Sequence, residues 1–207
     1  MVSELGHRER KKRELRDRLL ATALELFVTT GYAETSMDDI AARCDVSRGT
    51  VFNYFARKED LLVAWIETRR AAARDQIARD SDAPTAERLR DALGAICKLH
   101  ERDAPASRAL IRAWLQAGGP LLERASDTAA VLCDVLEAGR KRGDIRRDVD
   151  TDAAALALLD VYLGALYRWA AEPERKPTSL TRDLVAALSP LLRGLTAEVS
   201  PTSRSTR

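Results

Sequence analysis

Apolar residues recur at helical spacing along almost the whole chain. The first stripe stops before Gly31, a residue suited to the left-handed end of a helix, and it consists of Leu19, Leu20, Ala23, Leu24 and Phe27. Helical patterns resume near Lys58, fade at residues 81–84, and continue over residues 85–102, 105–117, 121–142, 151–171 and 178–196. No segment alternates with the period of a strand, so the pattern predicts an all-α protein.

Between Gly31 and Lys58 lie signals for a short helix and a tight turn. Thr35 and Ser36 each stand three residues before an aspartate, a capping pattern that opens a helix through Ile40 and Arg43. The turn that follows is Cys44-Asp45-Val46, in which the short polar side chain of Asp45 tolerates a positive φ.

A second short helix follows the turn, capped by Ser47 and running to about Tyr54. Two short helices joined in this way predict a helix-turn-helix. Its apolar residues are expected on the inner face: Val51, Phe52 and Phe55, together with Val46 and Ile40. Four residues remain for the outer face, namely Arg48, Gly49, Thr50 and Asn53.

The outer face has the chemistry that reads base edges. Arg48 has the fork that suits guanine, Asn53 the amide that suits adenine, and Thr50 suits a thymine methyl or a phosphate. Gly49 costs about 1 kcal/mol relative to alanine inside a helix, and the absence of a Cβ would let the helix backbone approach a duplex closely. The alternative is a helical hairpin in which the glycine is incidental.

Charge and composition narrow the class of protein. The 207 residues carry a net charge of +2, with 45% hydrophobic and 32% charged residues. Residues 8–18 hold seven basic and three acidic side chains, typical either of an arm that binds nucleic acid or of a solvated helix start. The three separated cysteines favour a reducing compartment. With a polar N-terminus and no apolar run of about 20 residues, we expect a cytoplasmic protein outside the membrane.

Residues 19–66 resemble the DNA-binding domain of TetR-family transcriptional regulators. The matching elements are LFVTTGY at the end of the first helix, T-S-x-x-x-I-A, V-S-x-G-T-x-x-x-Y-F, and K-x-x-L entering the fourth helix. The resemblance implies that the third helix reads bases, while Tyr54, Lys58 and the start of the second helix contact phosphates. The expected DNA-binding residues are therefore Thr35, Arg48, Gly49, Thr50, Asn53, Tyr54, Arg57 and Lys58.

The chain departs from the pattern of the family in two places, the turn and the start of the fourth helix. The turn commonly reads Ala-Gly-Val there, and Asp45 adds a negative charge near the DNA face. The residue before Lys58 is usually a capping Ser or Asn, whereas this chain has Arg57. A missing cap costs about 1 kcal/mol, and a cation opposes the helix dipole. We therefore expect strain at Arg57 that a phosphate contact would relieve.

The helix over residues 151–171 is apolar nearly all round and must be buried on more than one side. Together with the stripe at 184–195 it predicts a four-helix dimer interface, an arrangement that the resemblance also implies and that a two-fold symmetric operator requires. The interface residues expected are Leu156, Leu159, Leu163, Leu166, Leu188, Leu191 and Leu192. The alternative is a larger monomeric core.

The resemblance places a small-molecule effector pocket between about residues 85 and 171. The side chains best suited to line it are His100, Trp114, Gln116, Asp160, Tyr162 and Tyr167, with Trp169 as a further candidate. Ordinary core packing is the alternative for each of them, and Asp160 could pair with an arginine or meet a cationic ligand. Cys97 and Cys133 fit small buried apolar groups, with a thiol sensor as the other interpretation.

These features predict a homodimeric, ligand-responsive regulator. We expect a repressor that releases a palindromic double-stranded operator when a small-molecule effector binds. Its domains are a DNA-binding domain over residues 1–56, with residues 1–18 as basic arm or helix start, a ligand-binding and dimerisation domain over 57–197, and a disordered tail over 198–207. His7 and His100 are the only histidines, and no catalytic motif is present, so we expect no enzyme, metal or cofactor. The alternative is a helical adaptor or architectural DNA-binding protein without effector control.

Overall fold

A computed structural model describes residues 2–79, 82–117, 120–172 and 174–197, with side chains of residues 2–6 and 120–126 left aside. The regular elements of the described residues are all helices, apart from one isolated bridge between Ile145 and Thr196. Its elements are α1 (Val2–Thr29), α2 (Met37–Arg43), α3 (Arg48–Tyr54), α4 (Lys58–Arg79), α5 (Thr85–Arg102), α6 (Ala104–Gln116), α7 (Pro120–Arg142), α8 (Thr151–Ala171), the 3-10 turn η1 (Pro177–Ser179) and α9 (Leu180–Leu195). The all-α prediction is confirmed. The expected tail at 198–207 lies outside the described residues.

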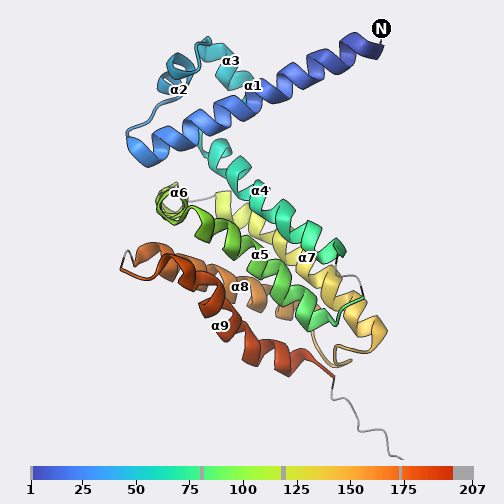
Figure 1. Cartoon of the computed structure of the whole chain (residues 1–207). Helices are drawn as coiled ribbons and strands as arrows, with labels where there is room; N and C mark the ends of the chain where they lie inside the picture. The colour runs from blue at the N-terminus through green and yellow to red at the C-terminus, as the bar shows by residue number, and fades with distance from the viewer. Residues whose placement is uncertain (1, 80–81, 118–119, 173, 198–207) are drawn as a thin grey trace, which may run out of the picture.

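The N-terminal head consists of α1, α2 and α3, with the start of α4 packed against α1 (Figure 1). Its core is built from the stripe that the sequence predicts and from both short helices; Leu19, Ala23, Phe27, Ile40, Val51 and Phe55 are all buried. The first half of α1 projects past the other head helices (Figure 1). The basic residues 8–18 are therefore part of α1, a single helix of 28 residues.

Local backbone geometry follows the predicted turn signals. Gly31 has φ 112°, so the first helix ends in the left-handed region where glycine is favoured. Asp45 has φ 52° in the turn between α2 and α3, as its side chain type predicts. These two residues set the angles at which α2 and α3 leave the end of α1.

The body is a helical bundle joined to the head by α4 and by the packing of α1 on α6. Helix α5 packs against α4 and α9, and α8 packs against α6, α7 and α9 (Figure 1). By length and composition alone α8 could cross a membrane, but half of its apolar stretch is buried within the bundle. Its burial against three neighbours identifies α8 as a core helix of the body.

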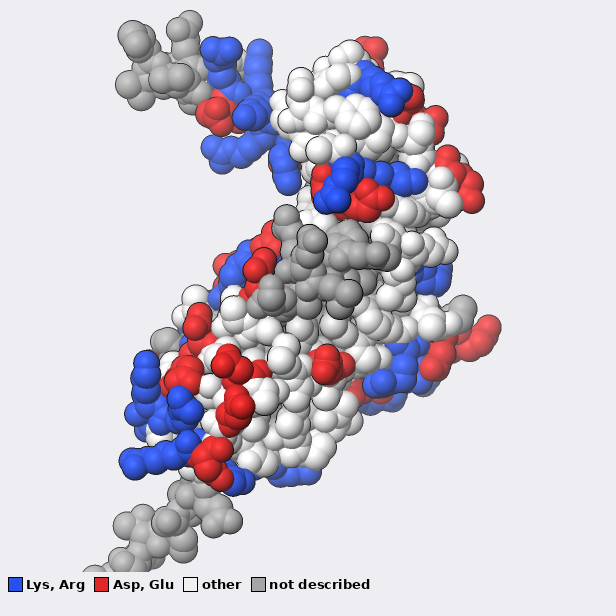
Figure 2. Space-filling model, turned by 180° about the vertical axis from the view of Figure 1, so that it is seen from behind, with Lys and Arg blue, Asp and Glu red and all other residues white. Residues whose placement is uncertain are grey.

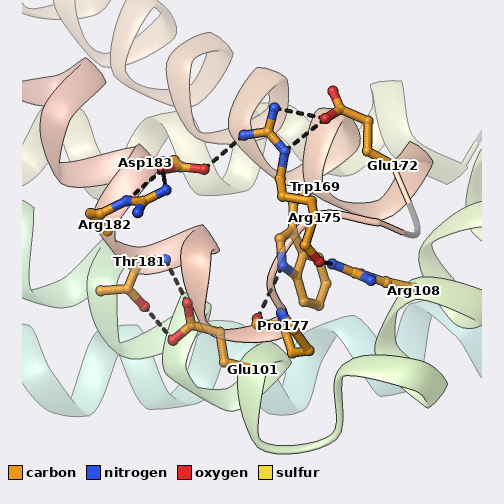
Figure 3. Close-up of polar contacts among 9 residues, drawn as sticks. All are labelled: Glu101, Arg108, Trp169, Glu172, Arg175, Pro177, Thr181, Arg182 and Asp183. Atoms are coloured by element: carbon orange, nitrogen blue, oxygen red, sulfur yellow. Dashed lines mark hydrogen bonds and ion pairs between the residues drawn. The ribbon is translucent and has the colours of Figure 1, made fainter.

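The connection from α8 to α9 is fastened to α5 and α6 by side chains (Figure 3). Ser179 provides no side-chain cap for α9; instead the carboxylate of Glu101 on α5 accepts hydrogen bonds from the backbone nitrogen and the hydroxyl of Thr181, both at 2.8 Å. Trp169 Nε1 donates to the carbonyl of Pro177 at 3.1 Å, and the Arg108 guanidinium lies 4.6 Å from the centre of the Trp169 ring. These contacts fix α9 relative to α8.

Candidate DNA-binding surface and body cavity

The start of α2 is held by a reciprocal cap. Asp39 N donates to Ser36 Oγ at 3.1 Å, and the Asp39 carboxylate accepts from Ser36 N at 2.8 Å and from Ser36 Oγ at 2.6 Å. The hydrogen bonds from Ser36 lower the pKa of the Asp39 carboxyl. Thr35 is only 2% exposed and its hydroxyl donates to the Gly31 carbonyl at 2.7 Å. This hydroxyl closes the preceding turn, so a phosphate contact at Thr35, which stays a prediction, would have to come from the backbone at the start of α2.

Helix α3 is capped by Ser47, whose Oγ accepts from Thr50 N at 3.1 Å. Val51 and Phe55 are buried as predicted, but Phe52 is 38% exposed, so its assignment to the inner face is wrong. The reason is helical geometry: Val51 and Phe55 are four residues apart and share the inner stripe, whereas Phe52 lies four residues after Arg48. Phe52 thus belongs to the same surface stripe as Arg48.

The outer stripe of α3 is exposed and ordered by contacts within the head. Arg48 Nη1 lies 3.1 Å from Asp38 Oδ2, and the Arg48 guanidinium lies 5.3 Å from the centre of the Phe52 ring. Gly49 and Asn53 are exposed, while Thr50 and Tyr54 are half-buried at the sides of the helix. The structure therefore places Arg48, Gly49, Phe52 and Asn53 on one accessible face.

Gly49 is not required by the fold. A Cβ built at this position would meet only Ser47 Oγ, at an ordinary distance of 3.9 Å, and Gly49 does not have a positive φ. Alanine would fit here and would favour the helix by about 1 kcal/mol. The fold of the chain therefore gives no reason for glycine at this position.

Lys58 is turned into the protein rather than toward a phosphate. Its ammonium donates to the carbonyls of Tyr32 at 2.6 Å, Thr35 at 2.9 Å and Ala33 at 3.5 Å. It also lies 4.2 Å from the centre of the Tyr32 ring. An ammonium has three donors, and all three are directed at this loop. The phosphate contact implied by the family resemblance is therefore not available to this side chain as it stands.

The start of α4 is stabilised despite Arg57. The backbone nitrogen of Arg57 donates to Asp60 Oδ2 at 2.9 Å, and its guanidinium Nη2 lies 3.3 Å from Asp60 Oδ1. Asp60 therefore takes the role of the acidic half of a capping box and pairs with the cation. The strain that the sequence predicts at Arg57 is offset within the free protein, although the Arg57 side chain remains 68% exposed.

The basic part of α1 lies beside the helix-turn-helix. The Arg16 guanidinium is 5.1 Å from the centre of the Phe55 ring, and Arg18 Nη2 donates to the Cys44 carbonyl at 3.4 Å. Figure 2 shows basic side chains gathered around the projecting part of α1, set off from the body by a hollow. Arg8, Lys11, Lys12 and other side chains of this segment are exposed.

The body contains a partly enclosed cavity of about 50 Å³. Helix α4 contributes one wall, and α5, α6, α7 and α8 complete it; the lining residues are Ile66, Arg69, Arg70, Ile96, Ile111, Trp114, Thr128, Leu159, Tyr162, Leu163, Leu166 and Tyr167. Of the predicted pocket residues, Trp114, Tyr162 and Tyr167 are in the wall. Burial raises the pKa of both tyrosines.

The other predicted pocket residues lie elsewhere, and these assignments are wrong. Gln116 and Asp160 are exposed and line no part of the cavity. His100 is completely buried behind it, with its ring 5.5 Å from that of Trp65, and burial and Arg69 lower its pKa to about 3. Trp169 is a core residue bonded to Pro177. Asp160 is exposed because it lies on the face of α8 that points away from the bundle.

The sequence does not single out Arg69 and Arg70, the two cations of the cavity wall. They occur in a helix whose other arginines are at the surface, so composition alone does not distinguish them. Their place in the wall depends on how α4 packs on α5. Among the described residues, no group of three or more His, Cys, Asp and Glu side chains could hold a metal ion.

Four of the seven predicted interface leucines are part of the core of a single chain, so their assignment to a dimer interface is wrong. Leu159, Leu166, Leu188 and Leu192 are buried, since they form the stripes along which α8 and α9 pack within the bundle. Leu156 is 53% exposed, and Leu163 and Leu191 are half-buried. Only these last three leave surface for a second subunit.

The comparisons with known proteins point to one family. The model of bacterial regulatory proteins of the tetR family matches residues 19–65. The transcriptional repressor KstR of Rhodococcus jostii is 31% identical over 164 residues, covering 76% of this chain and 74% of KstR. The regulator TcmR of Streptomyces glaucescens is 45% identical over 56 residues, which are 27% of this chain and only 25% of TcmR.

Solved structures extend the similarity to the body. The repressor FadR of Thermus thermophilus, solved in complex with lauroyl-CoA, has a TM-score of 0.65 and 28% identity, covering 90% of this chain and 97% of FadR. SmeT, the repressor of a multidrug efflux pump in Stenotrophomonas maltophilia, has a TM-score of 0.71 at 24% identity, covering 89% of this chain and 91% of SmeT. The similarity to SmeT concerns the fold alone.

Proposed function

Because the chain belongs to the tetR family of bacterial regulatory proteins, we propose that it is a cytoplasmic, homodimeric repressor that binds a two-fold symmetric DNA operator through α3. The observation that carries this proposal is the exposed outer face of α3. Arg48, Gly49, Phe52 and Asn53 lie there on a helix capped at its start and anchored by buried Val51. A helix of this kind fits the major groove of B-DNA.

Each outer side chain suits a different base feature. The Arg48 guanidinium can donate two hydrogen bonds to guanine, and the Asn53 amide can bond an adenine. Phe52 offers an apolar edge to a thymine methyl. The salt bridge from Asp38 orients Arg48 in the free protein, and guanine would replace that exposed pairing at little cost.

Phosphate contacts would come from groups beside α3. Thr50 and Tyr54 flank the outer face, Arg57 is exposed at the start of α4, and the amides of that helix start attract anions. Basic side chains along the projecting part of α1 add a further positive surface. Such contacts fix the position of the head on the duplex without reading its sequence.

Dimerisation would use the outer faces of α8 and α9. Leu156, Leu163 and Leu191 leave apolar surface there, and the contacts of Figure 3 hold the two helices in a fixed relation. A two-fold axis along this face would present two copies of α3 to an operator with half-sites about 34–36 Å apart.

The cavity offers a route for effector control because α4 belongs to both parts of the protein. Leu62 of α4 is completely buried where the helix meets the head, and Arg69, seven residues later, lines the cavity about 10 Å away along the helix. A ligand that shifts α4 would change the separation of the heads. Couplings between sites are typically about 1–3 kcal/mol, which would weaken operator binding about 5- to 150-fold. FadR, a repressor of similar fold, was solved in complex with lauroyl-CoA, which supports control of this chain by a small molecule.

Selection from a random duplex library tests the proposal. We expect the purified protein to enrich an inverted repeat whose half-sites lie about one helical turn apart. Enrichment of no sequence, with binding that depends only on salt, would contradict it and would favour an architectural DNA-binding protein.

A further inference from the structure

The charged groups of the cavity wall have one sign. Arg69 and Arg70 come from α4, whereas no aspartate or glutamate occurs among the described residues that line this cavity. Apart from Thr128, the rest of the wall is apolar or aromatic and includes Trp114 of α6 with Tyr162 and Leu166 of α8. A site with this composition favours a ligand that has an apolar body and a negative end.

Arg69 forms no ion pair among the described residues, although Asp103 lines the cleft on its other side. Its guanidinium lies 4.0 Å from the centre of the Trp65 ring, and its Nη1 donates to the Trp65 carbonyl at 3.3 Å and to Thr68 Oγ1 at 3.0 Å. Its Nε is buried without a hydrogen-bond partner in the described structure. Burial lowers the pKa of Arg69 to about 10, although Tyr162 and Asp103 favour its charged form.

Arg70 differs, because it shares a carboxylate. Glu67 Oε2 lies 3.7 Å from Arg70, and Glu67 Oε1 accepts from Arg74 at 2.6 Å. Arg70 therefore adds to the positive potential at the mouth of the cavity, while Arg69 keeps a donor in need of an acceptor. An anion beside Arg69 would gain the charge-assisted hydrogen bond that the protein itself does not provide.

We propose that this cavity binds an apolar monocarboxylate, whose carboxylate accepts hydrogen bonds from Arg69 and whose hydrocarbon part lies among Trp114, Tyr162 and Leu166. The inference rests on the proposed function only in naming this ligand as the effector. A guanidinium without an ion pair, in a wall that is otherwise mainly apolar and aromatic, matches a ligand with a single carboxylate.

Arg69 also links the cavity to the head. On its other side it lines a cleft where α1 meets α6, and this cleft also contains the acidic residues Glu25 and Asp103. A carboxylate that draws the guanidinium into the cavity would take it from the face of Trp65. The same residue would thus bind the ligand and loosen the contact between head and body.

The test compares dodecanoate with dodecan-1-ol, two probes of equal chain length that differ in charge. Binding is measured by isothermal titration calorimetry to the full chain, below the concentration at which the probes aggregate. The variants are Arg69→Gln, which removes the cation, and Arg69→Lys, which keeps it. Arg79→Gln is the matched control, since Arg79 is an exposed arginine of the same helix and lines no part of the cavity.

We expect the wild type and Arg79→Gln to bind dodecanoate at least about tenfold more tightly than the alcohol, a factor that corresponds to about 1.4 kcal/mol. Arg69→Gln should abolish that preference, and Arg69→Lys should retain part of it. The proposal is overturned if the wild type binds neither probe, if it binds both equally, or if the preference survives in Arg69→Gln. If Arg69→Gln does not fold, the preference for dodecanoate over dodecan-1-ol in the wild type and in Arg69→Lys still tests the proposal.

Operator binding is measured separately, with and without dodecanoate. Dodecanoate that binds at Arg69 without weakening operator binding would confirm the carboxylate site and contradict the effector role. A protein that selects no operator but still prefers the carboxylate would contradict the proposed function alone. Failure of the site and failure of the repressor function therefore give different results.

Discussion

The Lys58 ammonium donates to the Tyr32 carbonyl at 2.6 Å, across 26 residues of chain. With its further bond to Thr35, Lys58 ties the loop between α1 and α2 to the start of α4. Tyr32 is fixed from a second side, because its hydroxyl donates to Glu59 Oε1 at 3.1 Å. A lysine in the position of a phosphate-binding residue is thus a brace within the head of this protein.

Lys58→Met should therefore lower stability rather than only weaken DNA binding. Loss of hydrogen bonds from a charged group, with the carbonyls left partly buried, is expected to cost about 1–3 kcal/mol of unfolding free energy. Urea denaturation measures this cost. Arg57→Ala is the control: it removes an exposed ion pair, for which about 0–1 kcal/mol is expected. A Lys58→Met variant as stable as the wild type, with a reduced salt dependence of DNA binding, would restore the phosphate role.

Gly49→Ala should separate folding from DNA binding. The position accepts a Cβ without strain, so we expect the free protein to be equally stable or more stable by up to about 1 kcal/mol. Operator affinity should fall because the methyl group would keep α3 from the bases. Thermal unfolding and fluorescence anisotropy measure the two effects. Unchanged affinity would mean that the glycine is incidental to recognition.

The basic segment of α1 should contribute through charge alone. If Lys11 and Lys12 each contact a phosphate, the double variant Lys11→Ala/Lys12→Ala should lower the slope of log K against log salt by about 2. The effect should be equal on operator and random duplex, since phosphate contacts carry no sequence information. Lys141→Ala, exposed at the end of α7, is the control. Equal slopes for all three proteins would mean that the arm does not touch DNA.

His100 should make the fold sensitive to acid. Its pKa is about 3 in the folded protein, where burial is the main cause, against about 6.5 in an unfolded chain. Between these values the unfolded state binds a proton that the folded state does not. The stability contribution is therefore complete above about pH 6.5 and declines as the pH falls toward 3.

Replacement by an uncharged residue of similar size should remove this contribution. His100→Leu should lower the slope of unfolding free energy against pH by up to about 1.4 kcal/mol per pH unit between pH 6 and 4. Urea denaturation at several pH values measures both slopes. Parallel curves for the wild type and His100→Leu would show that His100 gains its proton without unfolding.

Local signals predict the parts of the fold that depend on neighbouring residues in the chain. Ser36 and Ser47 cap the helices they precede, and Gly31 and Asp45 adopt the positive φ that their side chains suggest. The helix bounds can be predicted from the same signals, because periodicity and capping residues are properties of short stretches of sequence. For the same reason the helix over 178–196 was predicted whole, although it divides into η1 and α9.

Tertiary packing decides what the sequence does not predict. The sequence alone predicts a surface cation at Lys58, whereas in the structure its ammonium donates to the Tyr32 carbonyl. Leu159 and Leu156 belong to the same apolar helix, yet only packing shows that the first is core and the second surface. Arg69 likewise resembles the other arginines of α4 until its burial beside Trp65 is known.

The base specificity of Arg48→Ala on the selected operator tests most directly whether the outer face of α3 reads the DNA sequence. Dissociation constants are measured by fluorescence anisotropy for the wild type and the variant, on the operator and on duplexes with each base pair replaced in turn. We expect Arg48→Ala to lose about 1–3 kcal/mol of binding free energy on the operator and to discriminate no longer at one base position. A uniform loss at every position, or no loss, would contradict the claim that the outer face of α3 reads the sequence.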